Sequence, residues 1–196
     1  MSRNTPRAIA LAGVMLVTAC ARVPQAEVDA ATAAFDAARV AEAEIYALDA
    51  YRSAAAALEA MRAELDEQAE LSPFARNYDS TLVLAAAARV AGDSALAAAT
   101  EQKEFAREDA LAALDVAKGD LVELRAMVDR APSRRGAPDP AALRSEAGTI
   151  ERTLATADSL LSAGRYSAAK EDVVAAQQQM LQLRSQLTQP TRPRRG

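Results

Sequence analysis

Apolar residues recur every three or four positions along most of the chain, a spacing typical of α-helices with one buried face. The pattern is most regular over residues 140–188, where it predicts two helices that meet at Gly164, a residue type suited to a helix C-cap. We expect an antiparallel α-hairpin with a coiled-coil-like seam here. The expected core positions are Leu143, Ala147, Ile150, Leu154, Ala157 and Leu161, then Tyr166, Ala169, Val173, Ala176, Met180, Leu183 and Leu187.

Residues 26–70 contain no glycine or proline, and an apolar stripe runs through them from Val28 to Leu65. This pattern predicts one helix of nearly 70 Å, at about 1.5 Å per residue, which needs an equally long partner to be stable. We expect that partner to begin near Pro73 and to continue towards Arg130, so that residues 26–131 form a long antiparallel helical hairpin. Phe74, Tyr78, Leu82 and Ala85 are its first expected core positions.

Gly92 leaves two interpretations of this second helix. It could end one helix, with Asp93 capping the next. An isolated glycine inside a long alanine-rich helix costs only about 1 kcal/mol, however, and we expect the helix to continue through it.

Proline, glycine and arginine concentrate in two other places. Residues 132–139 are predicted to be a linker, after which Asp139 caps a helix that begins at Pro140. Residues 189–196 are expected to be a disordered basic tail. The fold class predicted from these patterns is all-α: an elongated antiparallel bundle of long alanine-rich helices with a C-terminal α-hairpin.

Alanine accounts for 51 of the 196 residues, and the chain has no histidine, no tryptophan and one cysteine. Catalysis by a Cys–His or Ser–His–Asp arrangement is therefore absent, as are thiolate and imidazole metal sites. Removal of residues 1–19 would change the formal net charge from −4 to −6. An acidic chain with scattered charges argues against a nucleic-acid partner. We expect no catalytic residue, no cofactor and no metal.

Residues 1–19 have the layout of an export signal: Arg3 and Arg7 precede an apolar run of about ten residues, too short to span a membrane. Val17, Thr18, Ala19 and Cys20 follow, and this tetrapeptide resembles the lipobox of bacterial lipoproteins. The resemblance implies cleavage before Cys20, acylation of that residue, and a tether over residues 20–25. Because Ala21 rather than aspartate follows the cysteine, it also implies the outer membrane, with the protein facing the periplasm. An ordinary secretory signal is the alternative.

The alanine-rich helical region after the lipobox is similar to a family of bacterial lipoproteins of unknown function, on Pro24, Glu27, Ala30, Ala33, Ala37 and Tyr46, and on the Tyr51–Ala54 segment. This likeness implies a role in the cell envelope. Gly164, Tyr166 and Ala169 resemble the turn of a tetratricopeptide repeat, and the Gly92 segment is a partial second copy. This second resemblance implies an adaptor with a concave groove.

Four tyrosines stand out among the alanines as candidate partner contacts: Tyr46, Tyr51, Tyr78 and Tyr166. Packing along the helix seams is their alternative role. Carboxylates cluster in residues 64–70 and 101–109 and could serve a peptidoglycan-cleaving enzyme, although their spacing to Arg62 and Arg107 suits exposed helix-surface pairs. The sequence thus predicts a lipid-anchored, non-catalytic scaffold, spacer or docking module for an envelope protein or peptidoglycan. Self-association is a further expectation that the sequence leaves open.

Overall fold

The computed structural model describes residues 22–131 and 139–188, and within these ranges the chain is helical with no strand. The predicted all-α fold is confirmed. The helices are α1 (Gln25–Val40), α2 (Ala43–Tyr46), α3 (Leu48–Glu70), α4 (Asp79–Asp129), α5 (Pro140–Ser162) and α6 (Tyr166–Thr188). The predicted signal, lipobox and tail, and the predicted linker except for Asp139, lie outside the described residues.

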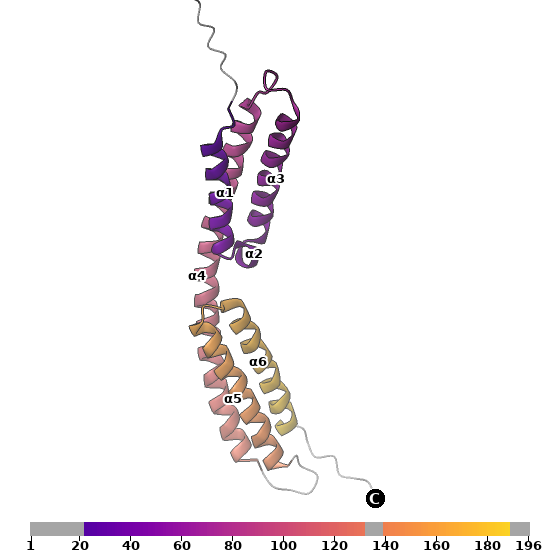
Figure 1. The fold of residues 1–196 in the computed structure, drawn as a ribbon. Coiled ribbons are helices and arrows are strands. Elements are labelled where there is room, and N and C mark those ends of the chain that lie inside the picture. The colour runs from indigo at the N-terminus through magenta and orange to yellow at the C-terminus, as the bar shows by residue number, and fades with distance from the viewer. Residues whose placement is uncertain (1–21, 132–138, 189–196) are drawn as a thin grey trace, which may run out of the picture.

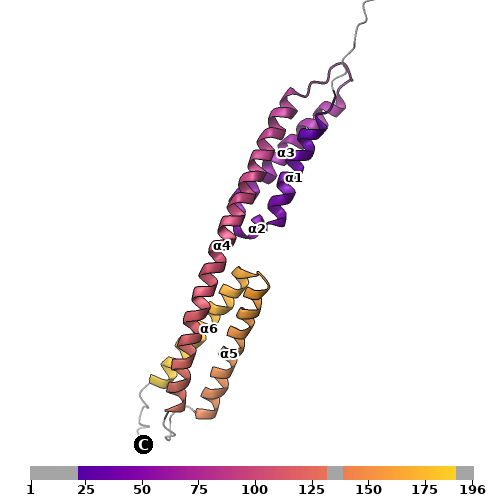
Figure 2. The same cartoon turned by 90° about the vertical axis from the view of Figure 1, so that its left-hand side faces the viewer.

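Helix α4 is the spine of the molecule (Figures 1 and 2). Its 51 residues extend about 75 Å at ~1.5 Å per residue. Helices α1 and α3 pack on its first half, and α5 and α6 pack on its second half. Neither α1 nor α3 contacts α5 or α6 in the part of the chain that the structure describes. The result is an elongated pair of three-helix bundles that share one helix.

We call α1, α3 and residues 79–100 of α4 the N-terminal bundle, and α5, α6 and residues 110–129 of α4 the C-terminal bundle. The buried residues of α4 step by threes and fours through both bundles, so they lie on one face of the helix. Both hairpins therefore cover the same side of α4, as Figure 2 shows. These buried residues are Thr81, Ala85, Ala88, Gly92, Ala95, Ala99, Ala110, Leu114, Ala117, Leu121, Leu124 and Val128.

The prediction of one helix over residues 26–70 is wrong. The chain turns back between α1 and α3, through a corner in which Glu42 has a left-handed backbone with φ of 61°. A continuous helix would have placed the buried residues of α1 and those of α3 on opposite faces, so only a reversal brings both onto α4. Residues 26–131 consequently form a three-helix bundle with an extended α4, and not one long hairpin.

Helix α4 runs through Gly92 without a break, which confirms the expected continuity and rules out a hairpin turn at this glycine. A Cβ atom on Gly92 would lie 2.8–2.9 Å from the backbone of Ala34 and Phe35 and from the Ala34 Cβ. The absence of a side chain at Gly92 therefore allows α1 and α4 to pack closely. A tetratricopeptide-like pair of turns at Gly92 and Gly164 is thereby excluded, and only the second turn exists.

The start of α4 also differs from the prediction. The helix begins at Asp79, not at Pro73, and Phe74 lies in the preceding loop with 88 % of its surface exposed. Leu82, another expected core residue, is 40 % exposed, whereas Tyr78 and Ala85 are buried as expected. The loop is held by hydrogen bonds from the Arg76 guanidinium to the carbonyl oxygens of Ala69 and Leu71, at 2.9 and 3.0 Å.

The C-terminal hairpin agrees with its prediction in detail. The Asp139 carboxylate accepts a hydrogen bond of 3.0 Å from the Ala141 amide, with Pro140 at the first helical position. Gly164, with φ of 74°, ends α5, and the amides of Gly164 and Arg165 donate to the carbonyls of Leu161 and Leu160. This is the Schellman arrangement of a glycine-capped helix. All the expected core positions are buried except Tyr166 and Leu187, which are partly buried against that core.

Candidate functional site

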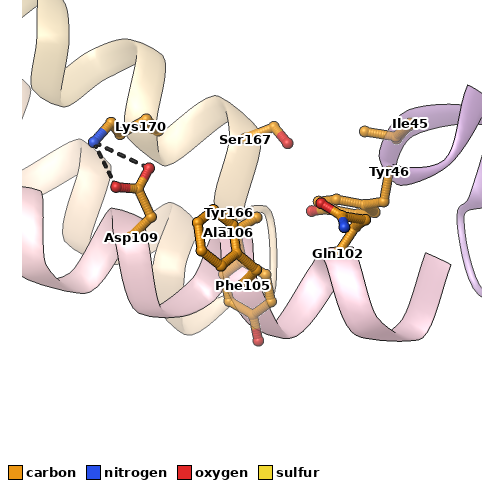
Figure 3. Close-up of a pocket in the computed structure, with 9 residues that line it drawn as sticks. All are labelled: Ile45, Tyr46, Gln102, Phe105, Ala106, Asp109, Tyr166, Ser167 and Lys170. Atoms are coloured by element: carbon orange, nitrogen blue, oxygen red, sulfur yellow. Dashed lines mark hydrogen bonds and ion pairs between the residues drawn. The ribbon is translucent and has the colours of Figure 1, made fainter. Parts of the chain in front are cut away.

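Between the two bundles, residues 101–109 of α4 lie beyond the buried stretches of both hairpins. Along the axis of α4, the corner at α2 lies at the N-terminal end of this segment, and the turn between α5 and α6 lies at its C-terminal end. Together they enclose a hollow of about 320 Å³ that we call the waist notch (Figure 3). Its lining residues are Ile45, Tyr46, Gln102, Phe105, Ala106, Asp109, Tyr166, Ser167 and Lys170.

The wall on the α2 side is fixed by Lys103 of α4. Its Nζ atom lies 2.6 Å from the Glu42 carboxylate and 5.7 Å from the centroid of the Tyr46 ring. The Glu42 carboxylate accepts a hydrogen bond from the Lys103 ammonium and so raises the pKa of Lys103, an effect that partial burial opposes. A left-handed backbone is costly for a residue with a side chain, and this partly exposed ion pair offsets part of that cost.

The opposite wall is the first turn of α6, which carries Tyr166, Ser167 and Lys170. The Lys170 Nζ atom lies 3.1 and 3.2 Å from the two carboxylate oxygens of Asp109 on α4 (Figure 3). Each wall of the notch is thus tied to α4 by one lysine–carboxylate pair. Such a notch has a defined shape before any partner arrives, which lowers the entropic cost of binding.

Aromatic side chains are concentrated at this notch. The chain has four tyrosines and three phenylalanines, and three of these seven residues line the notch: Tyr46, Phe105 and Tyr166. Phe105 is 67 % exposed and Ile45 is 62 % exposed. Exposed aromatic and aliphatic side chains around a preformed hollow are typical of a site that binds a partner.

The four predicted contact tyrosines have different environments. Tyr46 and Tyr166, 120 positions apart in the sequence, both line the waist notch. Tyr51 stacks on Phe35, with ring centroids 5.2 Å apart, and packs against the core of the N-terminal bundle. Tyr78 is buried just before α4. The last two tyrosines therefore pack in or beside the protein core.

Phe105, the most exposed of the notch aromatics, is not among the contact residues predicted from the sequence. Its signal was available, because Phe105 lies outside the three-and-four stripe of α4 and within a polar segment, where a large apolar side chain has no core to enter. The carboxylates near it are predicted to be either catalytic residues or members of exposed helix-surface pairs. Asp109 pairs with Lys170, and Glu104 lies 3.2 Å from Arg107, the helix-surface pair that the spacing indicated. Val17, Thr18, Ala19 and Cys20 lie outside the described residues.

By length and composition, α4 could cross a membrane. One 18-residue stretch of it has a mean hydropathy of 1.5, and 28 % of that stretch is buried. The stretch lies in the first half of α4, where Val83 and Val90 are 69 % and 68 % exposed on the side away from α1 and α3. Nothing in residues 22–131 or 139–188 covers this outward side.

Comparison with known proteins adds no relative: no protein-family model matches the chain, and neither the curated proteins nor the solved structures give a match.

Proposed function

We propose that this chain is a lipid-anchored scaffold of the bacterial outer membrane, facing the periplasm, that docks an envelope partner at the waist notch without catalysis. The observation that carries the proposal is the exposure of Phe105 and Ile45 in a preformed hollow between two separate cores. Tyr166 also packs partly against the core of the C-terminal bundle, whereas Tyr46 and Phe105 belong to neither core, in a chain with few aromatic residues.

The anchor rests on the lipobox-like tetrapeptide that ends at Cys20. The first described helix begins at Gln25, only five residues later. This helix start lies at the end of the molecule that also holds the loop between α3 and α4. Acyl chains on Cys20 would therefore hold this end near the membrane. Helix α1 is 16 residues, or about 24 Å, long, which places the notch at roughly that distance from the anchored end. Such a protein is a spacer as well as a docking module.

Photo-crosslinking in living cells tests the docking site. A photoreactive residue at position 105 should give a discrete adduct with a protein or with peptidoglycan fragments. The matched control is position 116 on the same helix, where Val116 is 61 % exposed but lies outside the notch. Equal adducts from both positions, or none from position 105, would contradict docking at the notch.

The anchor has its own test. Intact mass of the membrane form should show acylation, and Cys20→Ser should abolish both acylation and membrane association. A Cys20→Ser variant processed and acylated like the parent would show that the anchor assignment is wrong, whatever the crosslinking result.

A further inference from the structure

The charges around the waist notch indicate the chemistry of its occupant. Three basic residues at the notch have a carboxylate partner: Lys103 with Glu42, Lys170 with Asp109, and Arg107 with Glu104. Arg165, next to Tyr166, is exposed and has no ion-pair partner among the described residues. Three exposed acidic residues, one in α2 and two in residues 101–109 of α4, have no ion-pair partner among the described residues: Glu44, Glu101 and Glu108. The site therefore carries unneutralised negative charge.

Two of these free carboxylates flank the most exposed aromatic ring. Glu101 precedes Phe105 by four positions and Glu108 follows it by three, so the three side chains lie on one face of α4. A guanidinium group can stack on an aromatic ring while it pairs with a carboxylate. An arginine side chain from a partner fits this arrangement better than a neutral or anionic group.

The chain itself contains a segment of this chemistry. Residues 189–196 have the sequence Gln-Pro-Thr-Arg-Pro-Arg-Arg-Gly, with three arginines, two prolines and no acidic residue. Proline-rich segments favour an extended polyproline conformation and dock in aromatic-lined grooves, because little conformational entropy is lost on binding. The tail thus offers both the cations and the rigid apolar surface that the notch lacks.

The backbone of the tail ends short of the notch of its own molecule. Helix α6 runs from the notch to the far end of the C-terminal bundle, and its 23 residues extend about 33 Å. The eight residues after Thr188 extend at most about 27 Å when fully stretched. Docking in the same molecule would therefore need a fully stretched tail, whereas a second molecule that is shifted along its long axis brings its tail to the notch without stretching.

We propose that the waist notch binds the C-terminal tail, residues 189–196, of a second copy of this chain, with arginine side chains stacked on Phe105 and paired with Glu101 and Glu108. This inference rests on the proposed function, because it names the partner of the same docking site. The ion pairs are exposed, so the association weakens as salt concentration rises.

Sedimentation of the mature, detergent-solubilised protein tests the inference. The parent should self-associate with increasing concentration, and both Arg194→Ser/Arg195→Ser and Phe105→Ala should weaken that association at least tenfold. The matched control is Arg134→Ser/Arg135→Ser, which also removes two adjacent arginines, but from the predicted linker. This variant should associate like the parent. A photoreactive residue at position 105 should crosslink to residues 189–196 of another molecule.

Two results would overturn the inference. One is a parent protein that stays monomeric and does not bind a labelled peptide of residues 188–196. The other is self-association that Arg194→Ser/Arg195→Ser leaves unchanged. If position 105 still crosslinks to a different envelope component in cells, the proposed function stands while the tail is excluded as the occupant. If position 105 gives no adduct in cells and the peptide does not bind, both proposals fail.

Discussion

The two bundles share one helix but are held together differently. In the C-terminal bundle, α4 contributes leucine and valine to a single continuous core with α5 and α6. In the N-terminal bundle, the buried residues are mostly alanines, divided between two smaller clusters in which Leu58 and Met61 are the largest side chains. The first bundle in the chain therefore depends on close approach of backbones, and the second on burial of large side chains.

Ion pairs show the same contrast. Pairs between different helices connect α4 to α5 and α6 at several points along the C-terminal bundle: Lys118–Asp158, Arg125–Glu151, Arg144–Asp129, Lys170–Asp109 and Arg184–Asp120. In the described part of the N-terminal bundle, Arg39–Asp36 and Arg89–Asp93 each stay within one helix, and Lys103–Glu42 connects α4 to the corner just outside the bundle. Because of the difference in core packing, we expect the alanine-packed N-terminal bundle to tolerate added atoms poorly. We expect the leucine-packed C-terminal bundle to tolerate removed atoms poorly.

Leu124→Ala should produce the largest loss of stability. Leu124 is completely buried in the core of the C-terminal bundle, and truncation leaves a cavity among residues that cannot collapse fully. We expect the free energy of unfolding of this bundle to fall by about 2–5 kcal/mol. Hydrogen exchange should locate the loss in α5 and α6, with little change in α1 and α3. Leu111→Ala is the control, since Leu111 on the same helix is 47 % exposed; an equal loss there would contradict the assigned core.

Gly92→Ala tests the close contact in the other bundle. The added methyl group would meet the backbone of Ala34, which cannot move aside as a flexible side chain would. We expect a loss of about 1–3 kcal/mol, seen as faster amide exchange in α1. The control is Gly119→Ala, also inside α4, where no atom lies within 4 Å of the new Cβ. That change should stabilise the helix by about 0.5–1 kcal/mol. Stabilisation by both substitutions would refute the close contact.

The same contrast explains what the sequence could predict. In the C-terminal hairpin, the Asp139 cap, Pro140 and Gly164 mark the helix ends, and 18 residues from Leu143 to Leu161 make five turns of about 3.6 residues. The stripe therefore stays on one face. In residues 26–70, Leu58 follows Ala31 by 27 residues, or about 7.5 turns, and falls on the opposite face. The apolar stripe thus rotates around the helix axis along this segment, and that rotation is the signal in the sequence for a reversal of the chain. No glycine or proline indicates the position of the turn.

The waist notch could be predicted only in part. Tyr46 and Tyr166 stood out because large side chains are rare in this chain, yet nothing in their spacing indicates that they line one hollow. Their proximity follows from the turn at Glu42, which places α2 beside the middle of α4, and from the length of α5. Both are properties of the tertiary fold, and neither is encoded in a local pattern.

Asp139→Ala should have a smaller effect than either core change. The Asp139 carboxylate accepts the Ala141 amide hydrogen bond at the start of α5, and loss of such a cap costs about 1 kcal/mol. Asp139→Asn should keep most of the stability, because the amide oxygen also accepts this hydrogen bond. Thermal unfolding followed by circular dichroism measures both variants. Equal losses for alanine and asparagine would indicate that charge, and not capping, is responsible.

Lys103→Met should have the smallest effect, because the Lys103–Glu42 pair is partly exposed to solvent. We expect a loss of about 0.5–1 kcal/mol, with faster amide exchange confined to the corner between α1 and α3. The hydrogen bond to Glu42 raises the pKa of Lys103 above its ordinary value of 10.5. The contribution of the pair is therefore complete below pH 10.5 and is lost as the pH rises through the raised pKa. The stability difference between the parent and Lys103→Met should shrink accordingly in alkaline solution.

A second substitution separates the ion pair from the backbone conformation that it holds. Glycine adopts a positive φ without the cost that a side chain adds, so Glu42→Gly removes the partner of Lys103 and relieves the corner at the same time. In that background Lys103→Met should cost almost nothing at any pH. If Lys103→Met costs the same with and without Glu42, or if its cost does not change above pH 10.5, then packing of the lysine stem over Tyr46 stabilises this wall of the notch. Close packing would then stabilise even the corner beside the N-terminal bundle, and the contrast with the C-terminal bundle would be sharper than the described ion pairs indicate.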